Sequence, residues 1–223
     1  MEKRPYKIYC AGPLFNPIEK EEMAQIALVL ENAGYPVFLP QRDGLEFAEL
    51  FPFFIEKGFP AQSAQKILNM AIFSLDVFQI MNSSGLLLNM NGRVPDEGAM
   101  VEAGIAWAHN KVVVIFKNDS RSLIEGNCNP LVLGLADFSF VDSYDKIAGS
   151  FEVKFSAAVS NFLQAKEPIF EDATRRGKEI SDYLSAQKPS SDIADLLINL
   201  FRDKAWNISE DSKKNYSQVN TQP

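Results

Sequence analysis

A single carboxylate interrupts an apolar stretch in the middle of the chain, and it is the first residue to suggest chemistry. From Gly98 to Ala108, every residue except Glu102 is apolar or glycine. This pattern predicts a helix that is buried nearly all round. A carboxylate there is costly unless it is paired, hydrogen-bonded or open to a cleft. Glu102 is therefore either a structural residue tied to a neighbouring donor or a catalytic carboxylate near a helix N-terminus, where the dipole favours its ionised, nucleophilic form.

Carboxylates must carry any acid–base chemistry, because the chain has almost no histidine. His109 is the only one, and its place just after the predicted helix suggests a favourable end charge or a cap. The two cysteines, Cys10 and Cys128, form neither a metal-binding spacing nor a disulfide framework. We therefore expect no metal, no organic cofactor and a cytoplasmic location.

Composition limits the partners as well. The chain has 223 residues, enough for one α/β domain with an appendage, and a formal net charge of −7. Because phosphate binding needs a basic face, a nucleic acid is not an expected partner. No apolar stretch approaches the length of a membrane span, and none follows Met1 to Pro5 as in a signal peptide. A small, nearly neutral substrate fits these features best.

Strands and helices alternate along most of the chain. Apolar runs predict strands at residues 7–12, 35–40, 85–90, 111–117 and 138–141. Predicted helices cover residues 19–33, 61–81, 98–108, 121–135 and 145–166. This alternation predicts a three-layer α/β/α sandwich around a parallel sheet, and five strands favour the flavodoxin-like order 2-1-3-4-5.

Ligands of such sheets bind beyond the carboxyl ends of the strands. Four segments follow these ends, at residues 9–15, 41–44, 89–102 and 127–131. The third contains Asp96, whose side chain suits a helix N-cap. The Phe-rich residues 45–60 are predicted to be irregular, and they could form a lid, a pocket wall, core filling or a subunit contact.

The chain becomes polar after Glu167. We therefore place the main domain at residues 1–167 and a small helical appendage at residues 168–205. Residues 206–223 are rich in Ser, Asn, Lys and Gln, which predicts a disordered tail.

Three groups of residues resemble a known family. They are the run Ile8–Phe15, then Asp76, then Asp96-Glu97-Gly98 with Glu102 four residues after the glycine. In this order they resemble the nucleoside 2-deoxyribosyltransferase family over about residues 5–145. The Asp–Gly–Glu spacing at the start of a helix that follows a strand is fairly specific.

Two features depart from the family's pattern. Ala99 stands where the family commonly has Thr or Ser, and the chain after about residue 165 has no counterpart in the short members. In some members the C-terminus reaches a neighbour's active site, and we do not carry that role over to this chain.

The resemblance implies a role for each matching residue. Glu102 would be the nucleophile that attacks C1′ of the deoxyribose, Tyr9 the hydroxyl that positions it, and Asp76 the acid that protonates the departing base. The implied substrate-binding residues are Asp96 and Asn129 at the sugar hydroxyls, Phe15 stacked on the base, Gly12, and Gln41, a candidate for the base edge from its place after the second strand. Asp76 lies among Phe and Ile residues and near other acids, so a raised pKa is expected.

Each of these residues also has a structural interpretation. Asp96 could be only an N-cap, Tyr9 only a core residue, Asp76 a solvent-facing side chain, and Phe15 a plug for its turn. Their common position at the predicted ligand edge favours function over chance.

The function implied by the resemblance is transfer of 2-deoxyribose between nucleobases, by double displacement through a covalent glycosyl-enzyme. The partners would be deoxyribonucleosides, free nucleobases and further copies of the chain in a homo-oligomer. One alternative is an N-glycosidase that gives the sugar to water, and another is a non-catalytic module that senses a nucleotide or base. Arg42 and Arg93 are the only arginines at strand ends, which favours a nucleoside over a 5′-phosphate.

Overall fold

The structure is a computed structural model of the chain. It describes residues 3–92, 96–119, 128–163, 169–186, 192, 196–197 and 199–200. The chain divides into two compact units, Met1–Lys166 and Glu167–Pro223. The first unit contains the sheet and the predicted site residues.

Four parallel strands form the sheet of the first unit. They are β1 (Ile8–Ala11), β2 (Val37–Phe38), β3 (Gly85–Asn89) and β4 (Val112–Phe116), in the spatial order β2-β1-β3-β4. In the register, Tyr9 lies opposite Leu86, and Leu87 lies opposite Val114. The connections run in opposite directions from β1 and β3, so the switch point at which such sheets bind ligands lies beyond these two strands.

The predicted fifth strand, residues 138–141, is not a strand. Val141 forms a single parallel bridge with Phe116. Asp137 and Phe138, however, have φ angles of 55° and 58°, in the left-handed region. Such residues cannot continue an extended strand. The predicted five-stranded order 2-1-3-4-5 is therefore wrong, whereas the parallel α/β sheet and the order 2-1-3-4 of the first four strands are confirmed.

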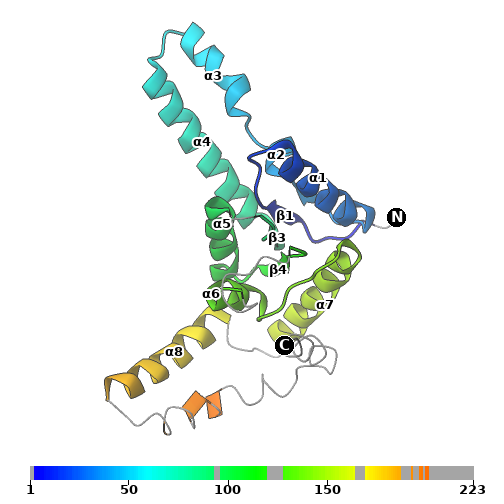
Figure 1. The fold of residues 1–223 in the computed structure, drawn as a ribbon, viewed down its shortest axis with the longest axis vertical. Helices are drawn as coiled ribbons and strands as arrows, with labels where there is room; N and C mark the ends of the chain where they lie inside the picture. Colours follow the sequence, from blue (N-terminus) through cyan, green and yellow to red (C-terminus); the bar gives the residue numbers. More distant parts are fainter. Residues whose placement is uncertain are drawn as a thin grey trace, which may run out of the picture. The chain divides into compact units, whose positions relative to one another are not determined.

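Helices cover both faces of the sheet, as a three-layer sandwich requires. Helices α1 (Pro17–Asn32) and α7 (Tyr144–Leu163) pack on one face, and α4 (Ala61–Met81) and α5 (Glu97–Ala108) pack on the other (Figure 1). Successive side chains of a strand point to opposite faces. On β1, Cys10 therefore joins the core under α1 and α7, and Tyr9 joins the core under α4 and α5.

Several boundaries follow the local signals in the sequence. Pro17 is the first residue of α1, after the N-cap Asn16, whose side chain accepts from the backbone of Ile18 and Glu19. Gly34 follows this helix with φ 88°, a conformation that suits glycine. Helix α4 covers residues 61–81 as predicted.

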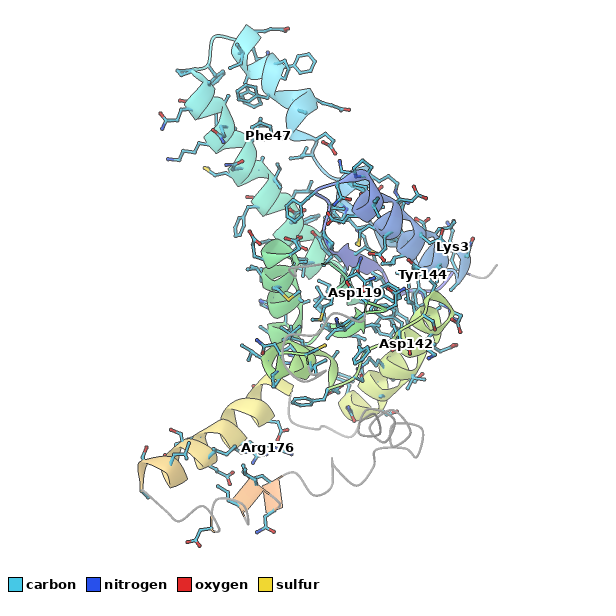
Figure 2. All side chains as sticks on the ribbon, in the orientation of Figure 1. Lys3, Phe47, Asp119, Asp142, Tyr144 and Arg176 are labelled. Carbon is cyan, nitrogen blue, oxygen red and sulfur yellow. The ribbon has the colours of Figure 1, made fainter. Side chains whose placement is uncertain are left out.

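The Phe-rich residues 45–60 are mostly helical rather than irregular. They contain α3 (Phe47–Glu56), which packs against α4 as a helical hairpin (Figure 1). The rings of Phe47 and Phe51, one turn apart, stack with centroids 5.4 Å apart. This spacing supports a helix despite Pro52 in its interior. Figure 2 labels Phe47 at the start of the hairpin.

Short helices complete the first unit. Helix α2 (Pro40–Asp43) replaces the turn predicted after the second strand, and α6 (Pro130–Leu133) precedes the 3-10 turn η1 (Gly134–Ala136). No helix in the described part of the first or second unit is both long and apolar enough to cross a membrane.

The second unit contains α8 (Ile169–Ser185), an amphipathic helix. Arg176, labelled in Figure 2, pairs with Asp172 at 2.8 Å and donates to the backbone oxygen of Leu200 at 2.6 Å. The predicted tail, residues 206–223, lies outside the described residues. The boundaries proposed for the appendage and tail stay predictions.

Candidate active site

A buried tyrosine and a half-buried glutamate meet on the α4 and α5 face of the sheet. The Tyr9 hydroxyl donates a hydrogen bond of 2.7 Å to Oε1 of Glu102. Tyr9 is fully buried on β1, where its ring stacks on Phe38 with centroids 5.5 Å apart. Although 93 positions separate Tyr9 and Glu102 in sequence, the β1–β3 pairing and the packing of α5 on these strands bring them together.

Asp76, on α4, approaches the same hydroxyl. A hydrogen bond with Tyr9 lowers the pKa of Asp76, but desolvation by burial has the larger effect, and the net pKa is raised. The raised pKa agrees with the expectation from sequence. The structure therefore groups all three predicted catalytic residues around one phenol oxygen.

Burial makes Glu102 a weaker acid than an ordinary glutamate. Its pKa is raised to about 7, chiefly by burial and further by the negative charges of Asp76 and Asp96, while the hydrogen bond from Tyr9 lowers it. The expectation that the helix dipole would favour the ionised form is not met. Glu102 is beyond the first turn of α5, where the dipole is weak, and burial outweighs it.

The prediction that this helix is buried nearly all round is also wrong. The buried residues of α5 are Ala99, Ala103 and Ala106, on one face, whereas Val101 is 59% exposed. The cause is that α5 covers one face of the sheet and has no second layer above it in the described unit. Glu102 lies at the edge of the buried face.

Asp96 is the N-cap of α5. Its Oδ1 accepts from the Gly98 backbone at 3.0 Å, and the Ala99 backbone also hydrogen-bonds to it. Burial is the main effect that raises the pKa of Asp96, and the charges of Glu97 and Glu19 add to it. The cap therefore forms with Ala99 in place of the family's Thr or Ser. We refer to Tyr9, Asp76, Asp96 and Glu102 together as the carboxyl cluster.

Phe15 follows β1 in the connection to α1. Its backbone N–H donates to Oε2 of Glu19 at 2.8 Å, and its side chain is 76% exposed. A ring this exposed does not fill the turn, so the structural interpretation of Phe15 as a plug for its turn is wrong. An exposed aromatic ring is available for stacking.

The remaining predicted residues have local structural roles. A Cβ at Gly12 would lie 2.5 Å from Sδ of Met23 and 2.8 Å from Cβ of Asn89, so only glycine fits there. Gln41 donates to the backbone oxygen of Lys20 at 2.8 Å, and Asn129 caps α6 by accepting from the Leu131 backbone at 2.9 Å. Among the described residues, no hydrogen bond joins these side chains or that of Phe15 to the carboxyl cluster, so their roles at substrate stay predictions.

A polar network that the sequence did not predict lies on the opposite face of the sheet. We call Glu22, Asn89, Asn91 and Asn118 the amide network. Asn89 and Asn91 are 0% and 7% exposed, and both donate to the Glu22 carboxylate. Its only sequence signal is a pair of asparagines at the end of an apolar strand, around Met90.

Cations near the strand ends are already paired. Arg42 forms ion pairs of 2.9 Å with Glu31 and 2.8 Å with Asp43. Arg93, the other arginine considered from sequence, lies outside the described residues. Within the described part of the chain, no cluster of three or more His, Cys, Asp or Glu side chains could hold a metal ion.

Two hollows of the surface lie apart from the carboxyl cluster. One, of about 420 Å³, is lined by Arg4, Tyr35 and Glu152 among others. The other, of about 520 Å³, is lined by residues that include Ile18, Glu22 and Tyr144. Neither is lined by Tyr9, Asp76 or Glu102.

Comparison with known structures supports the fold. A conserved protein from Enterococcus faecalis V583 is 21% identical, with a TM-score of 0.51, over 66% of this chain and 98% of its own. A 2-deoxyribosyltransferase from Bacillus psychrosaccharolyticus is 18% identical, with a TM-score of 0.46, over 64% and 90%. A CMP N-glycosidase from Clostridium botulinum is 16% identical, with a TM-score of 0.39, over 66% and 98%. At these identities only the first likeness bears on the fold, and none bears on the activity.

Comparison with families identifies the chain. No curated protein matches it significantly. Residues 8–187, most of the chain, match the model of the family described as nucleoside 2-deoxyribosyltransferase. The resemblance seen in the sequence is therefore confirmed: the chain belongs to the nucleoside 2-deoxyribosyltransferase family, an enzymatic family that acts on nucleosides and nucleobases.

Proposed function

We propose that this protein moves 2-deoxyribose from a deoxyribonucleoside to another nucleobase through a covalent glycosyl-enzyme on Glu102. One observation carries the proposal. Two carboxyl groups, Glu102 and Asp76, share one buried phenol, and the Tyr9 hydroxyl donates to the first of them. Glycosyl transfer with a covalent intermediate needs one carboxylate as nucleophile and a second carboxyl group as acid.

The phenol can set these two protonation states. Burial, together with the charge of Glu102, raises the pKa of Tyr9 far above neutrality, so the group stays a neutral phenol. A phenol has one hydrogen to donate and an oxygen that can accept. With Tyr9 donating to Glu102, a protonated Asp76 can donate to the Tyr9 oxygen. This arrangement holds Glu102 ionised and Asp76 protonated, the state from which the reaction starts.

The first displacement forms the glycosyl-enzyme. A carboxylate oxygen of Glu102 bonds to C1′ while the bond from C1′ to the base nitrogen breaks, and the proton of Asp76 goes to the leaving base. In the second displacement, a nitrogen of the incoming base bonds to C1′, Asp76 takes up its proton, and the bond to Glu102 breaks. Each displacement inverts C1′, so the product retains the configuration of the substrate.

The charges around the site support a nucleoside as substrate rather than a nucleotide. The charges that act on Glu102 are those of Asp76 and Asp96, and Glu19 acts on Asp96. A 5′-phosphate would add further negative charge to this region. Arg42 has two carboxylate partners and is not available to a phosphate without losing them.

The exposed apolar side chains of the α3–α4 hairpin support the proposal that the chain forms a homo-oligomer. Phe53, Met70 and Phe73 are 57%, 59% and 65% exposed, and no residue of α3 is buried. Exposed apolar surface of this kind is typical of a protein contact. Light scattering tests the proposal: a mass of two or more chains supports it, and a monomer at micromolar concentration contradicts it.

Base exchange tests the enzymatic proposal directly. The protein is incubated with deoxyinosine and adenine, and the products are separated by chromatography. We expect deoxyadenosine from the wild type and at least a thousandfold less from Glu102→Gln, because the amide is a very poor nucleophile. Glu97→Gln, at an exposed position in the same helix, is the matched control and keeps the activity.

Two outcomes would contradict the proposal. Hypoxanthine released without deoxyadenosine would assign the protein as a hydrolase that uses water as acceptor. No turnover with a panel of purine, pyrimidine and 5′-phosphate donors would leave a binding protein, in which Glu102 is a ligand contact.

A further inference from the structure

Glu22 is the centre of the amide network. It lies on α1, on the face of the sheet opposite the carboxyl cluster, and its two carboxylate oxygens have different partners. Oε2 accepts from Nδ2 of Asn89 at 2.8 Å, and Oε1 accepts from Nδ2 of Asn91 at 2.7 Å. The Tyr144 hydroxyl also hydrogen-bonds to Glu22. One carboxylate therefore satisfies two buried amides and connects α1, β3 and the start of α7.

The network continues to the end of β4. Oδ1 of Asn91 accepts from the backbone N–H groups of Asn118 at 3.0 Å and Asp119 at 3.1 Å. Nδ2 of Asn91 also donates to Oδ1 of Asn118 at 2.7 Å. Asp119 in turn accepts from the Gly92 backbone at 3.2 Å. Side chains therefore hold the ends of β3 and β4 to each other beyond the last strand hydrogen bonds. Figure 2 labels Asp119 and Tyr144, which hydrogen-bond to Asn91 and Glu22 of the network.

The geometry around Asn89 leaves little freedom. Its Oδ1 accepts from the Asn91 backbone at 3.0 Å, and its Nδ2 donates to Glu22. Both polar atoms of the side chain are therefore hydrogen-bonded. Gly12, at the end of β1, has no room for a Cβ because Asn89 and Met23 are in the way. A shift of Asn89 would therefore disturb β1 and β3, the two paired strands on which α5 packs.

The network and the nucleophile are connected through β3. Asn89 is the last residue of β3, and α5, the helix that carries Glu102, packs on β3 and β4. Strand β1, which carries Tyr9, pairs with β3. A displacement of the end of β3 would therefore change how Glu102 lies relative to Tyr9, and Glu22 contacts that end from α1.

We propose that Glu22 is a positioning residue for the reaction: through Asn89 and Asn91 it fixes the end of β3, and thereby the distance between Glu102 and Tyr9. The proposal rests on the proposed function, because it assigns Glu22 a role in that reaction. Glu22 itself contacts neither the carboxyl cluster nor the reacting atoms. A carboxylate suits this position because each of its two oxygens accepts from a different N–H group. An amide at residue 22 has only one oxygen and would place its own NH2 group against one of the two donors.

The test compares two matched substitutions on α1. Glu22→Gln removes one acceptor and adds a donor, and Glu21→Gln makes the same change on the exposed neighbouring residue. We expect the rate of glycosyl-enzyme formation in Glu22→Gln to fall between about tenfold and a hundredfold, since small displacements of reacting groups have effects of this size. Glu21→Gln should match the wild type.

A double substitution separates positioning from loss of folded protein. In Glu22→Gln with Asn89→Asp, the new Asp accepts from the Gln amide and from the Asn91 backbone, and the Gln oxygen accepts from Nδ2 of Asn91. The hydrogen bonds that join residues 22, 89 and 91 are restored, with donor and acceptor exchanged between residues 22 and 89. We expect this double variant to recover most of the rate lost in Glu22→Gln. Thermal unfolding followed by circular dichroism identifies the temperatures at which all variants are folded, and the rates are compared there.

The burst of released base and the pH profile complete the test. The burst amplitude counts active molecules, so a lower rate constant at full amplitude indicates misplacement rather than unfolding. Weakening of the Tyr9 hydrogen bond should also move the acid limb of kcat/KM to higher pH in Glu22→Gln and return it in the double variant. The inference would be overturned by equal rates and pH profiles in Glu22→Gln and Glu21→Gln, or by a lower burst amplitude as the only change. A wild type without turnover would instead overturn the proposed function itself.

Discussion

The two polar clusters of this fold lie on opposite faces of one sheet, and they differ in how their donors and charges are matched. In the amide network, donors and acceptors match, and Glu22 receives hydrogen bonds on both carboxylate oxygens. In the carboxyl cluster, burial raises the pKa of Glu102 to about 7, and the charges of Asp76 and Asp96 add to the effect of burial. Matched groups stabilise a fold, whereas buried like charges destabilise it and are typical of a functional site.

The first prediction concerns the stability cost of the carboxyl cluster. The pKa of Glu102 is about 7 in the folded state against an ordinary value of 4.5, so the folded protein holds the proton more tightly. The stability contributed by Glu102 is therefore complete below pH 4.5 and is lost as the pH rises to about 7. Glu102→Gln should be more stable than the wild type by on the order of 3 kcal/mol above pH 7, and equal to it near pH 4. Urea unfolding of both proteins at several pH values measures the difference, and a difference that does not change with pH would contradict the account.

The second prediction concerns the proton donor. Asp76→Asn should lower kcat/KM for base exchange roughly a hundredfold or more, because the leaving base loses its acid. The reaction starts with Asp76 protonated, so loss of this proton at higher pH gives the basic limb of the wild-type pH profile, and Asp76→Asn should lack that limb. Asp145→Asn, at an exposed position on α7, is the matched control. A basic limb that persists unchanged in Asp76→Asn would contradict the role of Asp76 as the acid.

The third prediction concerns the amide network. Asn89→Ala should destabilise the protein by about 2 kcal/mol, because it leaves the Glu22 oxygen and the Asn91 backbone N–H without their partner. The effect should be similar from pH 6 to pH 9, unlike that of Glu102→Gln. Thermal unfolding across this range checks it, and a stabilising effect would remove the contrast between the two clusters.

The fourth prediction has the smallest expected effect. Tyr9→Phe removes the hydrogen bond that lowers the pKa of Glu102, so the acid limb of kcat/KM should move above pH 7. We expect kcat to fall about tenfold, the loss typical of one hydrogen bond to a charged group. An acid limb that stays in place or moves to lower pH would contradict the role given to Tyr9.

The sequence predicted the helix ends and bounds that depend on interactions between residues close together in the chain. The N-cap Asp96 and the bounds of α4 follow from capping and periodicity. The alternation of strands and helices was enough for the order of the first four strands. The family resemblance rested on short motifs, and the family match confirmed it.

The incorrect predictions concern features that depend on tertiary structure or on backbone geometry. The left-handed conformations of Asp137 and Phe138 ended the fifth strand, although the residues there suit a strand. The alanines of α5 did not show which face lies against the sheet. Glu22 is one of several charged residues near the start of α1, and only folding places it opposite Asn89 and Asn91.

One measurement tests the central claim most directly. The wild-type protein is mixed with deoxyinosine in the absence of an acceptor base, quenched in acid and digested, and its peptides are analysed by mass spectrometry. The account predicts one added deoxyribosyl group, on the peptide that contains Glu102, and its loss when adenine is added before the quench. Exchange of the base without any labelled peptide, or a label on a residue other than Glu102, would contradict it.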